Sequence, residues 1–153
     1  MGSLIASPCQ PRSVLMLLLS VSLLPLVGCG PAGPKTVPVS GTVTLNGQPV
    51  PHLVVHFMPD EGRPSWGYTD EQGRFTLNYT RDRDGAELGK HKVWFVYEPK
   101  AQDAGQEMEW MKSGPPRASE ELAAALQKYG SDSASPLTLD VQQSESDLQL
   151  KLD

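Results

Sequence analysis

From residue 37 onward, apolar and polar residues alternate with a period of two in seven short stretches. These are 37–45, 50–58, 66–69, 74–79, 92–97, 137–142 and 148–153. Successive side chains of a β-strand point to opposite faces, so each stretch predicts a strand with one buried face. The stretch 92–97 is apolar on both faces, which predicts a strand in the middle of a sheet. About seven such strands predict an all-β sandwich.

Turn-forming residues lie between several of these stretches. Asn46-Gly47 tolerates positive φ angles and predicts that the chain reverses there into a second strand over about 50–58. Asp70 and Gly73 predict another turn, because the aspartate side chain can cap it and the glycine can take the left-handed position. The polar stretch 143–147 predicts a hairpin that joins the last two strands.

The strand pattern stops between residues 98 and 135, which we interpret as an insertion near the C-terminal strands. One part of it, 119–129, predicts a short helix, because Ser119 is a good N-cap and Gly130 follows the last turn. An apolar face of this helix would pack against the sandwich. Its members are Leu122, Leu126 and Tyr129.

The N-terminal segment has the pattern of an export signal. Residues 13–27 are nearly all apolar, and this run of about 15 residues is shorter than the roughly 20 that a transmembrane helix needs. It ends in Leu26, Val27, Gly28 and Cys29, which match the bacterial lipobox. The match implies that a diacylglyceryl group is attached to the Cys29 sulfur and that the chain is cleaved after Gly28.

This match predicts three parts: a cleaved signal peptide (1–28), a lipidated cysteine with a flexible Pro/Gly-rich tether (29–36) and the β-domain (37–153). The predicted location is therefore the outside of the cell, in the envelope. Gly30 rather than aspartate follows Cys29. In a cell with two membranes an aspartate there resembles a signal for retention in the inner membrane, so its absence favours the outer membrane.

Composition limits the chemistry of the mature chain. Cys9 is removed with the signal peptide, so neither a disulfide nor a free thiol is expected. Arg12 is the one charged residue before position 29, which leaves 12 Lys and Arg against 18 Asp and Glu, a net charge of −6. An acidic domain without a basic cluster is not expected to bind nucleic acid, or anionic lipid through a basic face.

Two strings resemble carboxypeptidase regulatory-like domains, whose fold is the transthyretin-like (prealbumin-like) Greek-key sandwich. VSGTVTLNGQPVP at 39–51 resembles the opening of that domain, and TDEQGRF at 69–75 resembles its second hallmark. Together with the lipobox and the tail from Lys128 to Leu152, they resemble small bacterial lipoproteins that carry this domain. The resemblance implies a fold and an envelope location and little chemistry.

The residues predict no catalytic, cofactor or metal site. His52 and His56 share a strand face, but four strand residues span about 13 Å, too far for both to hold one metal ion. The main enzyme alternative on this fold is the transthyretin-like hydrolase, which is recognised by a C-terminal Tyr-Arg-Gly-Ser. This chain ends Leu-Lys-Leu-Asp instead.

We therefore predict a non-catalytic binding or structural module, held to the membrane by the lipid at Cys29, with a protein or glycan partner in the envelope. Its expected interaction surface lies in the insertion, where Trp110, Met108 and Met111 would expose aromatic and thioether groups. The loops at 60–68, with Trp66, and at 80–90 are the next candidates. The alternatives are a transthyretin-like hydrolase and an accessory subunit of a larger envelope complex.

Overall fold

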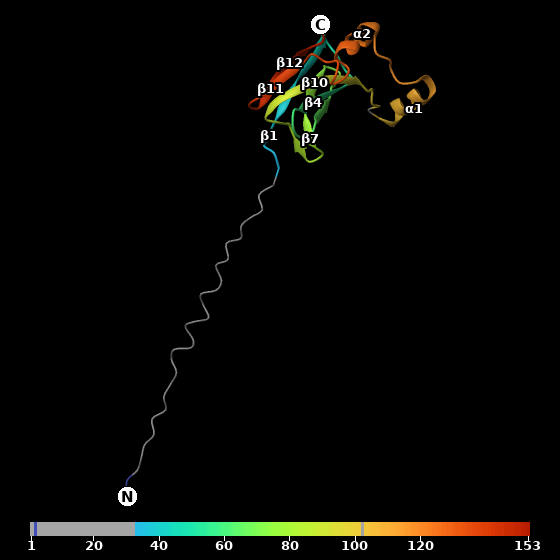
Figure 1. Cartoon of the computed structure of the whole chain (residues 1–153). Helices are drawn as coiled ribbons and strands as arrows, with labels where there is room; N and C mark the ends of the chain where they lie inside the picture. Colours follow the sequence, from blue (N-terminus) through green and yellow to red (C-terminus); the bar gives the residue numbers. More distant parts are fainter. Residues whose placement is uncertain (1, 3–32, 102) are drawn as a thin grey trace. The chain divides into compact units, whose positions relative to one another are not determined.

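The computed structural model describes residue 2, residues 33–101 and residues 103–153. These residues form twelve strands and two helices (Figure 1). The strands are β1 (Thr36–Val37), β2 (Val39–Leu45), β3 (Gln48–Pro49), β4 (Leu53–Pro59), β5 (Ser65–Tyr68), β6 (Arg74–Thr76), β7 (Asn78–Thr80), β8 (Arg83–Asp84), β9 (Ala86–Glu87), β10 (Gly89–Tyr97), β11 (Thr138–Val141) and β12 (Glu145–Lys151). The helices are α1 (Ala104–Ser113) and α2 (Glu120–Tyr129).

The strands form an all-β sandwich, as the sequence predicts. One sheet has six strands in the order β11-β10-β4-β5-β7-β8, and its neighbours are antiparallel. The other has the order β12-β2-β3, with β6 also paired to β2 and with β12 parallel to β2. The pair β1-β9 stands apart from both. The prediction that 92–97 lies inside a sheet is confirmed, because β10 has β11 and β4 on its two sides.

A single core lies between the two larger sheets. The six-stranded sheet contributes Val55, Phe57, Val93 and Phe95, and the other sheet contributes Val39, Val43, Phe75 and Leu150. Each of these side chains contributes about 1.5–3 kcal/mol when it is fully buried. No cysteine lies among the described residues of the sandwich, so packing has to supply its stability.

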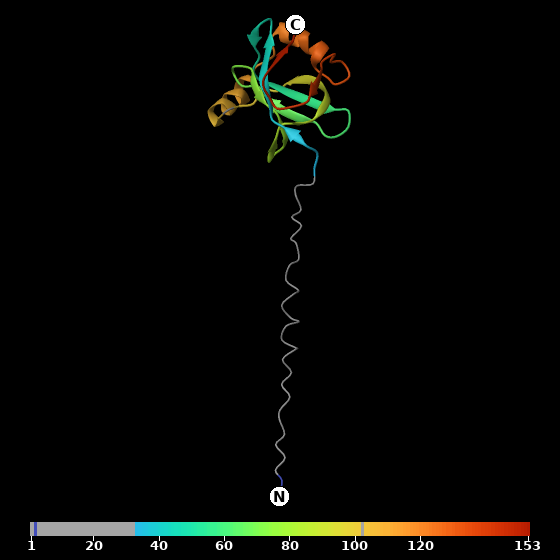
Figure 2. The same ribbon diagram turned by 90° about the vertical axis from the view of Figure 1, so that its left-hand side faces the viewer.

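The helix predicted over 119–129 is confirmed as α2. The Ser119 hydroxyl accepts a hydrogen bond from the Leu122 amide at 3.1 Å and caps the first turn. Leu122 and Tyr129 are buried against the core. The Tyr129 hydroxyl also donates to the main-chain oxygen of Asp153 at 2.9 Å. Figures 1 and 2 show α2 near the C-terminus.

The insertion contains two helices rather than the single one that the sequence predicts. α1 begins after Asp103, whose carboxylate accepts from the Gln106 amide at 2.8 Å, and it ends at Gly114, where φ is 81°. No residue of α1 is buried, so the helix lacks the apolar stripe by which most helices are recognised in a sequence. The capping residues Asp103 and Gly114 are the local sequence signals for this helix.

Two strand connections differ from the prediction. The segment 143–147 does not close a hairpin, because β11 pairs with β10 while β12 pairs with β2 in the other sheet. The turn at Asn46-Gly47 is present, with φ of 51° and 78°, but the returning strand is β3, and β4 lies in the six-stranded sheet. In both places the chain crosses from one sheet to the other.

The folded domain begins slightly earlier than the predicted boundary at 37. Thr36 lies in β1, opposite Glu87 of β9. Arg83 Nε donates to Thr36 Oγ1 at 2.9 Å, and its guanidinium also donates to the Pro34 carbonyl. Part of the segment predicted as tether is therefore held by the sandwich.

Candidate functional site

Three ring-bearing residues lie side by side on the outer face of the six-stranded sheet. His56 of β4 is the direct cross-strand neighbour of Trp94 on β10 and of Trp66 on β5. All three alternate with buried core residues such as Phe57 and Phe95, so their side chains point away from the core. Each is partly exposed.

His56 and Trp94 form a stacked pair. Their ring centroids are 4.9 Å apart and their planes differ by 8°, so each ring covers one face of the other. Burial lowers the pKa of His56 from its ordinary value of 6.5, and the negative charge of Glu98 opposes this shift only in part. Burial therefore favours the neutral form of the imidazole.

The next row of the same face is also apolar. Val54 lies between Val96 and Tyr68 in register, and it is 3% exposed although it belongs to the outer face. Val96 and Tyr68 are 38% and 40% exposed, and the Lys100 Nζ lies 3.5 Å from the Tyr68 ring centroid. We call this surface the outer aromatic face; its members are Val54, His56, Trp66, Tyr68, Trp94 and Val96.

A polar groove adjoins this face. It encloses about 600 Å³ and is lined by Tyr68 together with hydroxyl, amide and charged groups of β2, β6, β7 and β12. Ser40, Thr42, Thr76, Asn78 and Asp147 are among them. Asn78 Nδ2 also donates to the Trp66 carbonyl at 3.3 Å, so the groove and the outer aromatic face meet along β5 and β7.

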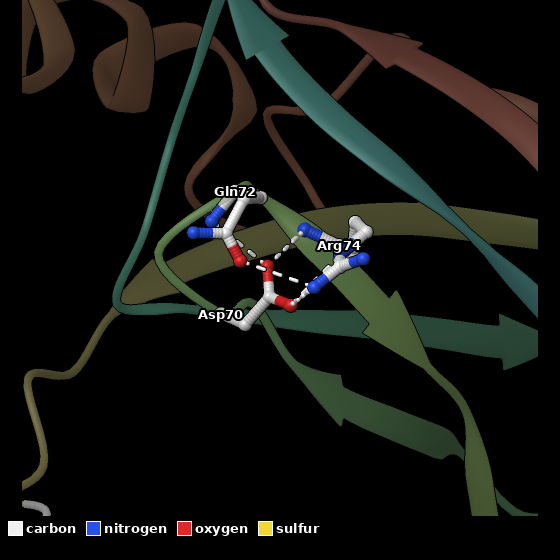
Figure 3. A network of polar contacts seen from close by, with 3 residues as sticks. All are labelled: Asp70, Gln72 and Arg74. Atoms are coloured by element: carbon white, nitrogen blue, oxygen red, sulfur yellow. Dashed lines mark hydrogen bonds and ion pairs between the residues drawn. The ribbon is translucent and has the colours of Figure 1, made fainter.

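The turn predicted at Asp70 and Gly73 borders the groove, and its hydrogen bonds are confirmed (Figure 3). Asp70 Oδ1 accepts from the backbone amides of Gln72 at 2.9 Å and Arg74 at 2.8 Å, and Oδ2 accepts from Arg74 Nε at 2.9 Å. Burial raises the pKa of Asp70, but these hydrogen bonds and the charge of Arg74 outweigh it and hold the pKa below the ordinary 3.8.

We expect Asp70→Asn to lower the stability at pH 7 by less than about 1 kcal/mol, because both members of the ion pair are exposed. A carboxylate with a depressed pKa in the folded state stabilises the protein above its unfolded pKa, and this effect is lost as the pH falls through the folded pKa. Melting temperatures over a series of pH values from 7 downward check this. A difference between wild type and variant that does not shrink as the pH falls below 3.8 would contradict it.

The structure does not bring the predicted surface residues together. Met108 and Met111 are 60% and 82% exposed on α1. Trp110 is half-buried and, at about 100° per residue, lies about 160° around the helix from Met108 and about 100° from Met111. Trp66 belongs to the outer aromatic face. Both Figure 1 and Figure 2 show α1 beside the sandwich rather than between its sheets.

Sequence reasoning did not select His56, Tyr68 or Trp94 for the site. Their signal is the parity of the strand pattern, since His56 and Trp94 alternate with the core residues Phe57 and Phe95. Parity indicates that a side chain points outward, but it does not show which strands are neighbours. The shared face becomes visible only with the sheet order.

The structure does not place several other residues that the sequence analysis singled out. Residues 3–32, including Leu26, Val27, Gly28 and Cys29, lie outside the described residues. Within the described part of the chain, no three His, Cys, Asp or Glu side chains are grouped so that they could hold a metal ion. His91, for example, is buried and donates from Nε2 to the Glu87 carbonyl at 2.8 Å. Neither described helix is long and apolar enough to cross a membrane.

No protein-family model matches this chain, and no curated protein or solved structure matches it. The resemblance to carboxypeptidase regulatory-like lipoproteins and the transthyretin-like topology therefore stay predictions.

Proposed function

We propose that this chain is an exported, lipid-anchored, non-catalytic binding module, and that it binds a protein of the cell envelope through the outer aromatic face. The observation that carries this proposal is the row Trp94, His56 and Trp66 on three adjacent strands, beside the apolar row Val96, Val54 and Tyr68. On the other side of the ring row, Met58 and Lys92 face each other across β4 and β10. Tryptophan, tyrosine and methionine are enriched in protein interfaces, and large apolar patches on a surface mark interaction sites.

The stacking geometry favours a protein over a glycan as the partner. A sugar ring packs best on an open aromatic face, but His56 and Trp94 cover one face of each other, and Lys100 lies over the ring of Tyr68. Apolar side chains of a protein can instead pack against the edges of these rings and against Val96. Charged groups at the edge, Glu98 and Lys100 among them, would form the polar rim of such an interface.

A site-specific cross-link tests the surface. A photoreactive amino acid at position 96, in the lipidated protein and in native membranes, is expected to capture one defined protein. The same group at Gln149, which is exposed on the other sheet, is the matched control and should capture much less of it. An adduct whose added mass is removed by glycan hydrolases would instead show a glycan partner.

We expect Trp66→Ala and Trp94→Ala each to weaken this binding by about 30-fold, which corresponds to the roughly 2 kcal/mol of an interface hot spot. The affinity of each variant for the captured partner measures the effect, and its melting curve shows that it is folded. Met111→Ala, at a residue 82% exposed on α1, is the control and should bind normally. Normal binding by both tryptophan variants would sink the proposal.

Two further measurements separate the alternatives. A partner that co-purifies in fixed proportion from native membranes would make the chain an accessory subunit of an envelope complex. Turnover of a small substrate by the purified domain would favour the hydrolase.

A further inference from the structure

The chain enters the sandwich at one end, and several contacts hold it there. Arg83 binds the Pro34 carbonyl and Thr36 Oγ1, and β1 pairs with β9. The guanidinium groups of Arg63 and Arg83 each lie 5.4 Å from the Tyr79 ring centroid, so the loop at 60–64 is at this end too. The domain therefore has a fixed point of attachment.

Two further loops belong to this entry end, which we define as the loops 60–64, 81–82 and 142–144 around β1. Residues 81–82 join β7 to β8, directly before Arg83. The Glu145 amide, which follows the loop 142–144, donates to the Pro38 carbonyl at 3.0 Å. β2 runs away from β1 to the turn at Asn46-Gly47, and in Figures 1 and 2 β1 and the C-terminus lie at opposite ends of the sandwich.

Very little chain separates this end from the predicted lipid. Residues 30–33 lie between Cys29 and Pro34, so the two Cα atoms can be at most about 18 Å apart. The nine residues of β10 alone extend for about 30 Å. A tether shorter than the sandwich cannot let the domain turn its opposite end to the membrane.

We propose that the entry end faces the lipid headgroups of the membrane that holds the acyl chains, and that the turn at Asn46-Gly47, α2 and the C-terminus point away from it. This inference rests on lipidation of Cys29, which is part of the proposed function. The end carries both signs of charge, with Asp60, Glu61 and Asp82 beside Arg63 and Arg81. The arginines offset the repulsion between anionic headgroups and the acidic domain, so the entry end can face the membrane without a basic patch.

The outer aromatic face then stands at the side of the anchored domain, because it runs along β4, β5 and β10 between the two ends. A protein partner reaches it within a few nanometres of the membrane surface. This favours a partner that is itself attached to the membrane.

Energy transfer from single labelled cysteines to headgroup-linked acceptors tests the orientation. Once Cys29 is lipidated, a new cysteine is the one free thiol of the mature chain. The lipidated mature protein carrying Asp82→Cys, Thr138→Cys or Asn46→Cys is labelled and placed in vesicles of phosphatidylethanolamine and phosphatidylglycerol. Transfer is expected to be highest at 82, intermediate at 138 on the six-stranded sheet, and severalfold lower at 46.

The outcomes are distinguishable. Protein that does not float with the vesicles contradicts lipid anchoring, and so the proposed function. Protein that floats but shows equal transfer at 82 and 46 overturns the orientation alone, and higher transfer at 138 than at 82 would mean that the outer aromatic face lies on the membrane. A flexible insertion of about 20 residues before Pro34, which spans about 25 Å, should reduce the difference between 82 and 46. An unchanged difference would show that the tether does not set the orientation.

Discussion

Replacing Cys29 with serine is expected to abolish incorporation of labelled palmitate and to leave the chain as a precursor that still carries residues 1–28. The hydroxyl of serine cannot form the thioether that the lipobox match implies, and we expect cleavage after Gly28 to depend on that lipid. Each buried CH₂ contributes about 0.8 kcal/mol, so losing the two or three predicted acyl chains would remove the stable anchor that we propose. Palmitate labelling and the mass of the purified chain measure the effect.

Cys9→Ser is the matched control, because Cys9 lies in the segment predicted to be removed. This variant should be labelled and processed like the wild type. Label that persists in Cys29→Ser, or label that is absent from the wild-type protein, would contradict lipidation at this position. Either result would remove the premise of the membrane orientation as well.

Replacing Gly41 with alanine is expected to destabilise the domain by about 3 kcal/mol, the upper part of the range for overpacking. A Cβ at position 41 would lie 2.1 Å from the carbonyl oxygen of Leu148, which is backbone of β12. A side chain could rotate out of the way, but β12 can move only by losing some of the backbone hydrogen bonds that pair it with β2. Urea denaturation of the lipid-free mature domain (residues 30–153) measures the change.

Ser40→Ala is the control, since Ser40 is the preceding residue of the same strand and points to the other face. It loses one exposed hydrogen bond, from Ser40 Oγ to the Ser146 carbonyl at 3.3 Å, so its effect should stay below about 1 kcal/mol. Equal stability of the two variants would argue against the parallel pairing of β12 with β2. This test is sharp because the sequence predicts a hairpin there instead.

The hairpin error has a physical reason. The polar stretch between β11 and β12 has the length and composition of a hairpin loop, and alternation places Leu139 and Leu150 on buried faces in either arrangement. Contacts with segments far away in the sequence decide whether such a loop returns the chain to the same sheet or carries it to the opposite one. β12 gains its neighbour from β2, more than a hundred residues earlier in the chain.

The two helices of the insertion likewise differ in how well the sequence predicts them. α2 combines a cap with an apolar face and is predicted from both, whereas α1 has a cap at Asp103 and no buried face. The grouping of Trp110 with Met108 and Met111 assumed one exposed segment. On a helix these residues separate, because their angular spacing puts the tryptophan and the methionines on different sides.

The amino-acid sequence by itself determined the longer strands, the turns at Asn46 and Asp70, the helix α2 and the inward or outward direction of most side chains. These depend on interactions between residues a few positions apart. Only the tertiary structure decided that Trp66, His56 and Trp94 are neighbours, that β12 lies beside β2, and that Arg83 holds the entering chain. Those choices depend on contacts between distant segments, and a period of two reveals the face of a strand without revealing its neighbour.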